Sequence, residues 1–168
     1  LGNNSSGNDT NKSSPVKVLK GAYSGTTYLG DDSNNKIIAI AAGQFHSMAL
    51  AADGTVYVWG EGSVGQLGDD DLTNHSIPVK VLEGAYSGTT YLGDDSSNKI
   101  TAIAAGGRHC MALAADGKVF TWGYGGYGVL GNGSSSNRDT PVKVVKGEYS
   151  GTADLGDDSS KKITAVAG

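Results

Sequence analysis

Two histidines at matching places in the sequence are the first residues to weigh for chemistry. His46 and His109 are 63 positions apart, and each lies three residues after an Ala-Gly pair. An imidazole can act as a general base or bind a metal, but both roles need partner side chains at fixed spacing. No such partner recurs near either histidine. We therefore expect both to be structural residues that bond a neighbouring loop.

Pairs of aspartates recur with the same period. Asp31-Asp32, Asp94-Asp95 and Asp157-Asp158 each follow a glycine, and Asp69–Asp71 forms a further run. Calcium binds adjacent carboxylates and carbonyls, which makes these residues candidate calcium ligands. The spacing of an EF-hand loop is absent, however, and aspartate in such a context is also a common turn former. We expect turns here and no cofactor, with calcium as the alternative.

Catalytic groupings are hard to find in this sequence. No Ser–His–Asp set, carboxylate pair or phosphate-binding loop recurs in a supporting context. The glycine-rich segments 60–62 and 123–126 follow an apolar run instead of preceding a helix, where a phosphate would bind. We therefore expect that the chain is not an enzyme.

The elements that position these residues come from an internal repeat. The segment 15–67 is written again at 78–130 without insertion or deletion, 40 of its 53 positions are identical, and a third copy begins at Pro141. A fixed period of this length indicates one supersecondary unit that is stacked several times, with the core built between neighbours.

Composition narrows the class of protein further. Glycine makes up 27 of the 168 residues, the formal net charge is −4, and Cys110 is the single cysteine. An acidic chain with scattered lysines does not fit a nucleic-acid-binding face, which should be basic and clustered. No apolar run approaches the ~20 residues of a membrane span. We expect no nucleic-acid partner, no membrane span and no intrachain disulfide.

Each repeat reads as four strands, at roughly 15–19, 37–42, 46–52 and 55–60, or ten in the whole chain. The stretch 48–52 contains Met, Ala and Leu, which favour helix. Fewer than ten residues separate Gly43 from the Asp-Gly pair at 53–54, however, and such a helix would be marginal. A strand that ends in an Asp-Gly hairpin turn fits better. Four-stranded sheets repeated in this way predict an all-β chain of β-propeller blades.

Two stretches carry a family resemblance. They are AIAAGQFHSMALAADGTVYVWGEGSVGQLG at 39–68 and AIAAGGRHCMALAADGKVFTWGYGGYGVLG at 102–131. Their shared order of Ala-Gly, His, Ala-Leu, Asp-Gly, Trp-Gly and Leu-Gly resembles the regulator of chromosome condensation repeat. The resemblance covers nearly the whole chain and implies a propeller that closes a ring of about seven four-stranded blades.

The chain itself accounts for about two and a half blades. We divide it into repeats at 15–77 and 78–140, a partial repeat at 141–168, and the end of a preceding repeat at 1–14. Either the chain is part of a longer protein, which is the simpler expectation, or copies combine to complete a ring or a stack. Residues 21–35, which we call the excursion, make the repeat longer than is usual in this family. Repeats lengthened in this way resemble those of bacterial members that form part of large secreted or surface proteins. This resemblance weakly favours a secreted or cell-surface location.

Differences between the two full copies point to a candidate binding surface. Of the 13 differing positions, seven fall in two short places: Gln44, Phe45 and Ser47 against Gly107, Arg108 and Cys110, and Glu61, Ser63, Val64 and Gln66 against Tyr124, Gly126, Tyr127 and Val129. In antiparallel order the second strand ends and the third begins at the 43–46 turn, and the fourth strand returns from the Asp-Gly hairpin to end at Gly60, so both places lie on one face. The excursion should emerge on the opposite face or at the outer edge.

We expect this variable face to carry recognition, because loops on a rigid scaffold commonly do. The candidate residues are Phe45, Glu61, Arg108, Tyr124 and Tyr127, which include aromatic and arginine side chains favoured at interfaces. Plain drift in tolerant loops is the alternative.

The sequence thus predicts a non-catalytic scaffold that presents loops to a protein or glycan partner. The resemblance also implies a competing function, guanine-nucleotide exchange on a small GTPase, which the best-known family member performs. A third possibility is self-assembly into a fibre or surface structure.

Overall fold

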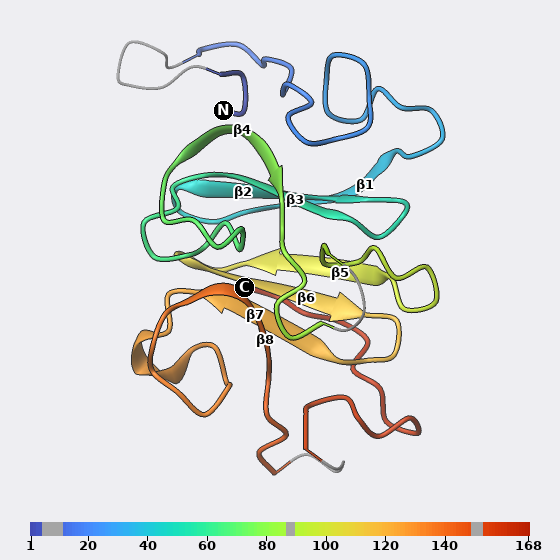
Figure 1. The fold of residues 1–168 in the computed structure, drawn as a ribbon, viewed down its shortest axis with the longest axis vertical. Coiled ribbons are helices and arrows are strands. Elements are labelled where there is room, and N and C mark those ends of the chain that lie inside the picture. The colour runs from blue at the N-terminus through green and yellow to red at the C-terminus, as the bar shows by residue number, and fades with distance from the viewer. Residues whose placement is uncertain (5–11, 87–89, 149–152) are drawn as a thin grey trace.

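The structure consists of two four-stranded antiparallel sheets that lie one above the other (Figure 1). It is a computed structural model, and it describes residues 1–4, 12–86, 90–148 and 153–168. The first sheet contains β1 (Ile37–Ala42), β2 (His46–Ala51), β3 (Val56–Gly60) and β4 (His75–Lys80). The second contains β5 (Ile100–Ala105), β6 (His109–Ala114), β7 (Val119–Gly123) and β8 (Arg138–Lys143), with the 3₁₀ turn η2 (Gly126–Gly128) between its last two strands.

The Ala-rich stretches form strands, as the turn signals predict. In the hairpin of the first sheet, Leu50 lies opposite Val56 and His46 lies opposite Gly60. The Asp-Gly pair closes the turn, where Gly54 has a φ of +100° and the Ala51 carbonyl accepts the Gly54 N–H at 2.9 Å. The second sheet repeats this register with an offset of 63, from His109 opposite Gly123. Each sheet is therefore one blade of a β-propeller.

The main core lies between the two blades. Met48 and Leu50 of β2 face the second blade and are buried in one cluster with Ile100, Phe120 and Trp122. Fully burying one such side chain contributes about 1.5–3 kcal/mol. Because this cluster draws on both blades, it is lost when the two sheets are separated.

The first strand of each predicted repeat belongs to the preceding blade, so the blades are offset from the sequence repeats. The strands β4 and β8 begin three residues before Pro78 and Pro141 and pair with β3 and β7. Pro15–Leu19 is not a strand: Leu19 forms an isolated bridge with Tyr28, its N–H donates to the Gly2 carbonyl at 2.7 Å, and the Val18 carbonyl accepts the Leu29 N–H at 3.0 Å. Residues 163–168 are not a strand either. The prediction of ten strands is therefore wrong, since the described residues form eight.

The outer edge of each blade is covered by the segment that precedes the first strand of that blade. The carbonyls of Pro78 in β4 and Pro141 in β8 accept the N–H groups of Ala22 and Ala85, at 2.9 and 2.7 Å. Proline in an edge strand has no N–H to leave unpaired, and a covered edge does not invite pairing with another chain. The part of the predicted preceding repeat at 5–11 lies outside the described residues.

The excursion lies at the hairpin end of the blades, as predicted, and it joins them. In the second repeat, a Cβ placed on Gly93 would lie 1.9 Å from the Gly54 carbonyl oxygen of the first blade. From the same excursion, the Asn98 side chain accepts the Asp116 N–H of the second blade at 2.9 Å. We call residues 84–86 and 90–99 the clasp, because they contact the hairpins of both blades.

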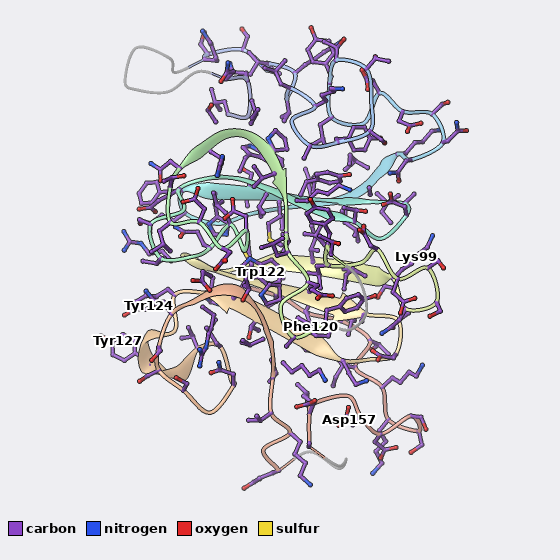
Figure 2. All side chains as sticks on the ribbon, viewed as in Figure 1. Lys99, Phe120, Trp122, Tyr124, Tyr127 and Asp157 are labelled. Carbon is purple, nitrogen blue, oxygen red and sulfur yellow. The ribbon has the colours of Figure 1, made fainter. Side chains whose placement is uncertain are left out.

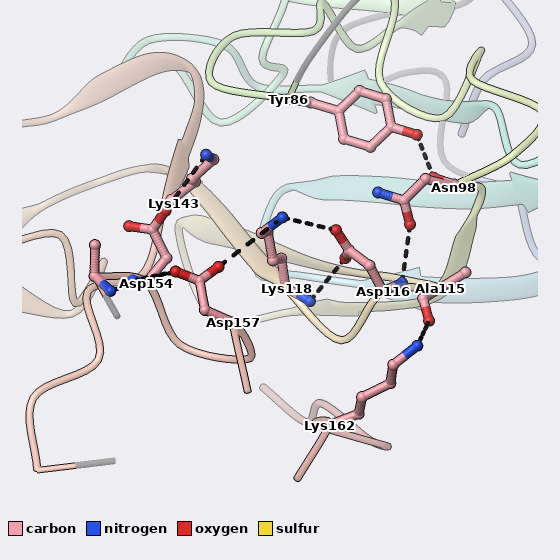
Figure 3. A network of polar contacts seen from close by, with 10 residues as sticks. Tyr86, Asn98, Ala115, Asp116, Lys118, Lys143, Asp154, Asp157 and Lys162 are labelled. Carbon is pink, nitrogen blue, oxygen red and sulfur yellow. Dashed lines mark hydrogen bonds and ion pairs between the residues drawn. The ribbon is translucent and has the colours of Figure 1, made fainter. Parts of the chain in front are cut away.

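A second set of polar contacts repeats this arrangement one blade later (Figure 3). Lys118 lies 2.9 Å from Asp116 and 3.9 Å from Asp157, and the Lys162 ammonium donates to the Ala115 carbonyl at 3.2 Å. Residues 153–162 therefore approach the hairpin of the second blade as the clasp approaches that of the first.

Candidate recognition face

The two variable places of each repeat meet at the end of the blades opposite the clasp. The Glu61 N–H donates to the Phe45 carbonyl at 2.9 Å, and the Tyr124 N–H donates to the Arg108 carbonyl at 2.9 Å. A third bond, from the Gln44 N–H to the Gly107 carbonyl at 3.0 Å, joins the turns of the two blades. We call this end, formed by residues 43–46, 61–74, 106–109 and 124–137, the loop face.

All five candidate residues lie on the loop face, and they differ in exposure. Tyr127 is 97% exposed and Phe45 is 57% exposed. Arg108 is exposed, while Glu61 and Tyr124 are half-buried. Figure 2 shows Tyr124 and Tyr127 at the edge of the molecule opposite Lys99. The face thus offers two well-exposed aromatic rings and an exposed guanidinium on adjoining blades.

Two asparagines hold the loops in place, and sequence reasoning missed them. The Asn74 side chain accepts the Gly62 N–H at 3.0 Å, and Asn137 accepts the Gly125 N–H at the same distance. The sequence could have indicated this role, because the asparagine is identical in both copies while most neighbouring loop residues differ. Since the same hydrogen bond forms in both blades, it holds the two variable loops in the same backbone position.

Tyr127 has an unusual backbone for its side chain. Its φ is +60° and its ψ is 12°, in the left-handed region that favours glycine. Asp70, the other positive-φ non-glycine residue of the two loops, is of a type that tolerates this region better. Such strain is characteristic of functional sites and is held by the surrounding structure. In this case the surrounding structure holds a tyrosine almost fully in solvent.

Replacing Tyr127 by glycine is therefore expected to stabilise the chain. The left-handed region costs about 1–2 kcal/mol for a residue with a Cβ, and an almost fully exposed ring loses little packing. Part of that gain is offset by the greater freedom of glycine in the unfolded chain. We expect the free energy of unfolding in urea to rise by a few tenths to about 1 kcal/mol. A fall of about 1 kcal/mol or more would show that the ring stabilises the loop.

His46 packs against the neighbouring blade, which supports a structural role. Its Nε2 lies 3.1 Å from the Cys110 sulfur in β6, so its neighbour is a strand residue and not a loop. The Cys110 thiol also donates to the Gln66 carbonyl at 3.3 Å. Burial raises the pKa of this thiol well above its usual value, which leaves it protonated and unreactive.

The stability of the chain should depend on His46 below neutral pH. Burial, and then the nearby His109, lower the pKa of His46 below its usual 6.5. The unfolded chain therefore takes up this proton first, so the stabilisation is complete above pH 6.5 and is lost as the pH falls below it. We expect the urea midpoint to fall more between pH 7.5 and pH 5 in the unsubstituted chain than in His46→Gln. An equal fall in both chains would contradict this role.

The aspartate pairs close turns. Asp31 accepts the N–H groups of Thr26, Thr27 and Tyr28 at 2.8–2.9 Å. These backbone bonds lower its pKa to about 2. Asp157 likewise accepts the Asp154 N–H at 3.0 Å. Within the described ranges, no group of three or more His, Cys, Asp or Glu residues could hold a metal ion.

An apolar groove lies on the first blade away from the loop face. It has a volume of about 370 Å³ and is lined mainly by Val18, Leu29, Ile37 and Ile40. The matching residues of the second repeat include Val81, Leu92 and Ile100, which are buried against the first blade. The groove therefore corresponds to a surface that is covered by a blade elsewhere in this chain.

Comparison with protein families gives consistent matches. A model described as "Regulator of chromosome condensation (RCC1) repeat" matches residues 53–113 and 116–168, and a second model of the same description matches 37–66 and 100–129. In the part of the chain that the structure describes, no helix is long and apolar enough to span a membrane.

Several curated proteins are similar to this chain. The mitochondrial RCC1 domain-containing protein RUG3 of Arabidopsis thaliana is 36% identical over 110 residues, which cover 64% of this chain and 22% of that protein. The ultraviolet-B receptor UVR8 of the same plant is 36% identical over 109 residues, which cover 65% and 22%. The probable E3 ubiquitin-protein ligase HERC4 of Homo sapiens is 38% identical over 107 residues, which cover 64% and 9%.

Solved structures share the fold. Human WBSCR16 matches with a TM-score of 0.51 and 29% identity, over 67% of this chain and 26% of that one. Yeast RCC1 (Prp20), solved with Kap60, matches with a TM-score of 0.56 and 24% identity, over 70% and 26%. The chain therefore spans about a quarter or less of the proteins it matches.

Proposed function

The chain belongs to the regulator of chromosome condensation (RCC1) repeat family, and on that premise we propose that it is a non-catalytic module whose loop face binds a protein or glycan partner. The observation that carries the proposal is the position of the differences between the repeats. The blades share their strands, hairpins and loop-holding asparagines, whereas the loop face presents different side chains in each blade. Phe45, Arg108 and Tyr127 are exposed among these.

The relatives favour a protein partner over a glycan. Yeast RCC1 (Prp20) was solved bound to Kap60, and the structure of Prp20p was described with its binding properties to Gsp1p and histones. Since this chain spans only about a quarter of those proteins, we propose that it acts as part of a larger assembly of blades. The apolar groove supports the proposal of a larger assembly, because its residues match those that are buried between the two blades of this chain. A secreted or surface location stays a prediction.

Site-specific photo-crosslinking tests which face is engaged. The amino acid p-benzoylphenylalanine would replace Phe45, Tyr127 or, at the clasp end, Tyr28 in the full-length protein, within the cells that make it. We expect adducts from Phe45 and Tyr127 and none from Tyr28. Protease and glycosidase treatment of the adducts would separate protein from glycan partners. Adducts from Tyr28 alone, or none from the loop face, would contradict the proposal.

Two alternatives have their own measurements. A nucleotide-release assay with a small GTPase would detect exchange activity, which the loop-face proposal does not require. The mass of the protein in solution would detect assembly into fibres or stacks. Accelerated release that is unaffected by changes on the loop face would favour exchange through another surface.

A further inference from the structure

The charge of the loop face changes sign between the two blades. Residues of the first repeat contribute four carboxylates, at Glu61, Asp69, Asp70 and Asp71, and the matching residues of the second repeat are Tyr124, Asn132, Gly133 and Ser134. Conversely, the two arginines of the chain, Arg108 and Arg138, match Phe45 and His75. Asp139 is the one carboxylate that the second repeat adds on this face, in place of Ser76. The face therefore has an acidic half and a basic half.

Both arginines lie beside the exposed tyrosine loop. The Arg108 carbonyl accepts the Tyr124 N–H, and Arg138 lies opposite Gly123, the residue before Tyr124. The Arg138 Nε is buried and has no hydrogen-bond partner in the described part of the chain. Arg138 as a whole is half-buried, so it keeps part of its surface open to solvent at the edge of this face.

Four lysines lie at the other end of the blades. Lys80 pairs with Tyr57 near the first hairpin, and Lys143 pairs with Phe120 near the second. Lys99 and Lys162 donate to the hairpin carbonyls of Ala52 and Ala115. The two arginines therefore lie at the opposite end of the blades from these lysines.

The two halves adjoin at fixed points. The Gln44 N–H bonds the Gly107 carbonyl at 3.0 Å, and the Asp70 N–H bonds the Asp139 carbonyl at 3.2 Å. A partner that covers the loop-face turns of both blades therefore contacts the acidic half and the basic half side by side. Charges arranged in this way set the orientation of a partner and exclude partners with like charges at the wrong place.

We propose that the loop face binds a protein segment whose two charge signs are separated into blocks. Acidic and apolar side chains lie over Arg108, Arg138 and Tyr127, where carboxylates accept from the guanidinium groups. Basic side chains lie over Glu61 and Asp70. A uniformly acidic or basic segment meets like charge in one half, and a neutral glycan uses neither half. The inference rests on the proposed function and specifies its partner.

Two synthetic peptides of one composition test this directly. In the block peptide, Asp, Glu and Leu residues precede a run of Lys; in the alternating peptide, the same residues alternate. Fluorescence anisotropy with the full chain is expected to show at least about tenfold tighter binding of the block peptide, with an advantage that shrinks as salt rises. Equal binding of the two peptides would overturn the proposal.

Matched variants locate the effect. Arg108→Gln with Arg138→Gln, and Glu61→Gln with Asp70→Asn, are each expected to remove most of the advantage of the block peptide. The control is Lys20→Gln with Lys36→Gln, which removes two exposed positive charges at the clasp end and should leave the advantage intact. Unfolding midpoints would confirm that each variant folds. Retention of the advantage in both loop-face variants would overturn the proposal.

The remaining outcomes separate this inference from the proposed function. If photo-crosslinks form from Phe45 and Tyr127 while the two peptides bind equally, recognition by the loop face stands and the charge rule fails. If the chain sediments as a dimer that the loop-face variants abolish, the occupant is a second copy of the chain, and the segment proposal fails.

Discussion

Replacing Gly93 by alanine is expected to destabilise the chain by about 3 kcal/mol or more, while the same change at Gly30 costs about 1–2 kcal/mol. The two glycines occupy the same position of the repeat and have nearly the same φ, +91° and +88°. They differ in what a Cβ would meet. At Gly93 it lies 1.9 Å from the Gly54 carbonyl oxygen, and at Gly30 it meets only the Ile37 side chain, at 3.5 Å.

The pair of variants therefore isolates the contact between the clasp and the first blade. Both lose the freedom of glycine at positive φ, and only Gly93→Ala must also push two backbones apart. Urea unfolding followed by circular dichroism measures both free energies. Equal losses would mean that the clasp does not hold the blades together.

Replacing Trp122 by alanine is expected to cost about 3–5 kcal/mol, one of the largest effects of any side chain. Trp122 is fully buried between the blades, and its indole N–H donates to the Gln66 carbonyl at 3.1 Å. Its removal leaves a cavity at the interface of the blades and takes one of two donors from the Gln66 carbonyl, which keeps the Cys110 thiol. The matching Trp59 is 7% exposed and packs with Tyr23 and Tyr57 on the other side of the first blade.

Trp59→Ala is the control, and its loss should be smaller because it leaves the interface of the two blades intact. Chemical denaturation followed by circular dichroism avoids dependence on tryptophan fluorescence. A loss at Trp59 that equals or exceeds the loss at Trp122 would contradict the central place of the inter-blade core.

The fold was largely predictable because each sequence signal for secondary structure occurs twice, at matching positions of the two full repeats. The Asp-Gly turns, the apolar strands and the family motif appear at the same offset, and the structure confirms the β-hairpins that they predict. The blade boundaries were not predictable from the repeat alone. A repeated sequence has no natural starting point, and only the pairing of β4 with β3 shows that the strand around Pro78 belongs to the earlier blade.

Part of the candidate site followed from strand order, and part did not. Antiparallel order places Phe45 beside Glu61 and Arg108 beside Tyr124, and the hydrogen bonds between them confirm this. The left-handed backbone of Tyr127 could not be predicted, because its counterpart, Val64, does not have a positive φ. The side-chain roles of Asn74 and Asn137 also needed the structure, since loop asparagines serve many turns.

Differences between the three repeats at one pair of positions show how the scaffold tolerates change. Lys17 lies over the ring of Tyr28 and Lys80 over the ring of Tyr91, each 4.8 Å from the ring centroid. In the third repeat, the matching residues are Lys143 and Asp154, which form an ion pair at 3.3 Å. A cation–π contact is thus replaced by an ion pair that keeps the lysine in place.

The most direct test of the account transfers the loop face of the first blade onto the second. The variant carries Arg108→Phe, Tyr124→Glu, Gly126→Ser, Tyr127→Val and Val129→Gln, so that each new residue is the one at the matching position of the first repeat. The glutamine is included because the Gln66 side chain accepts the Val64 N–H at 3.0 Å. The measurement is the yield of partner adducts through p-benzoylphenylalanine at position 45, together with the free energy of unfolding. The account predicts that the unfolding free energy changes by no more than about 1 kcal/mol while the adduct is lost. An unchanged adduct yield in the folded variant would contradict it.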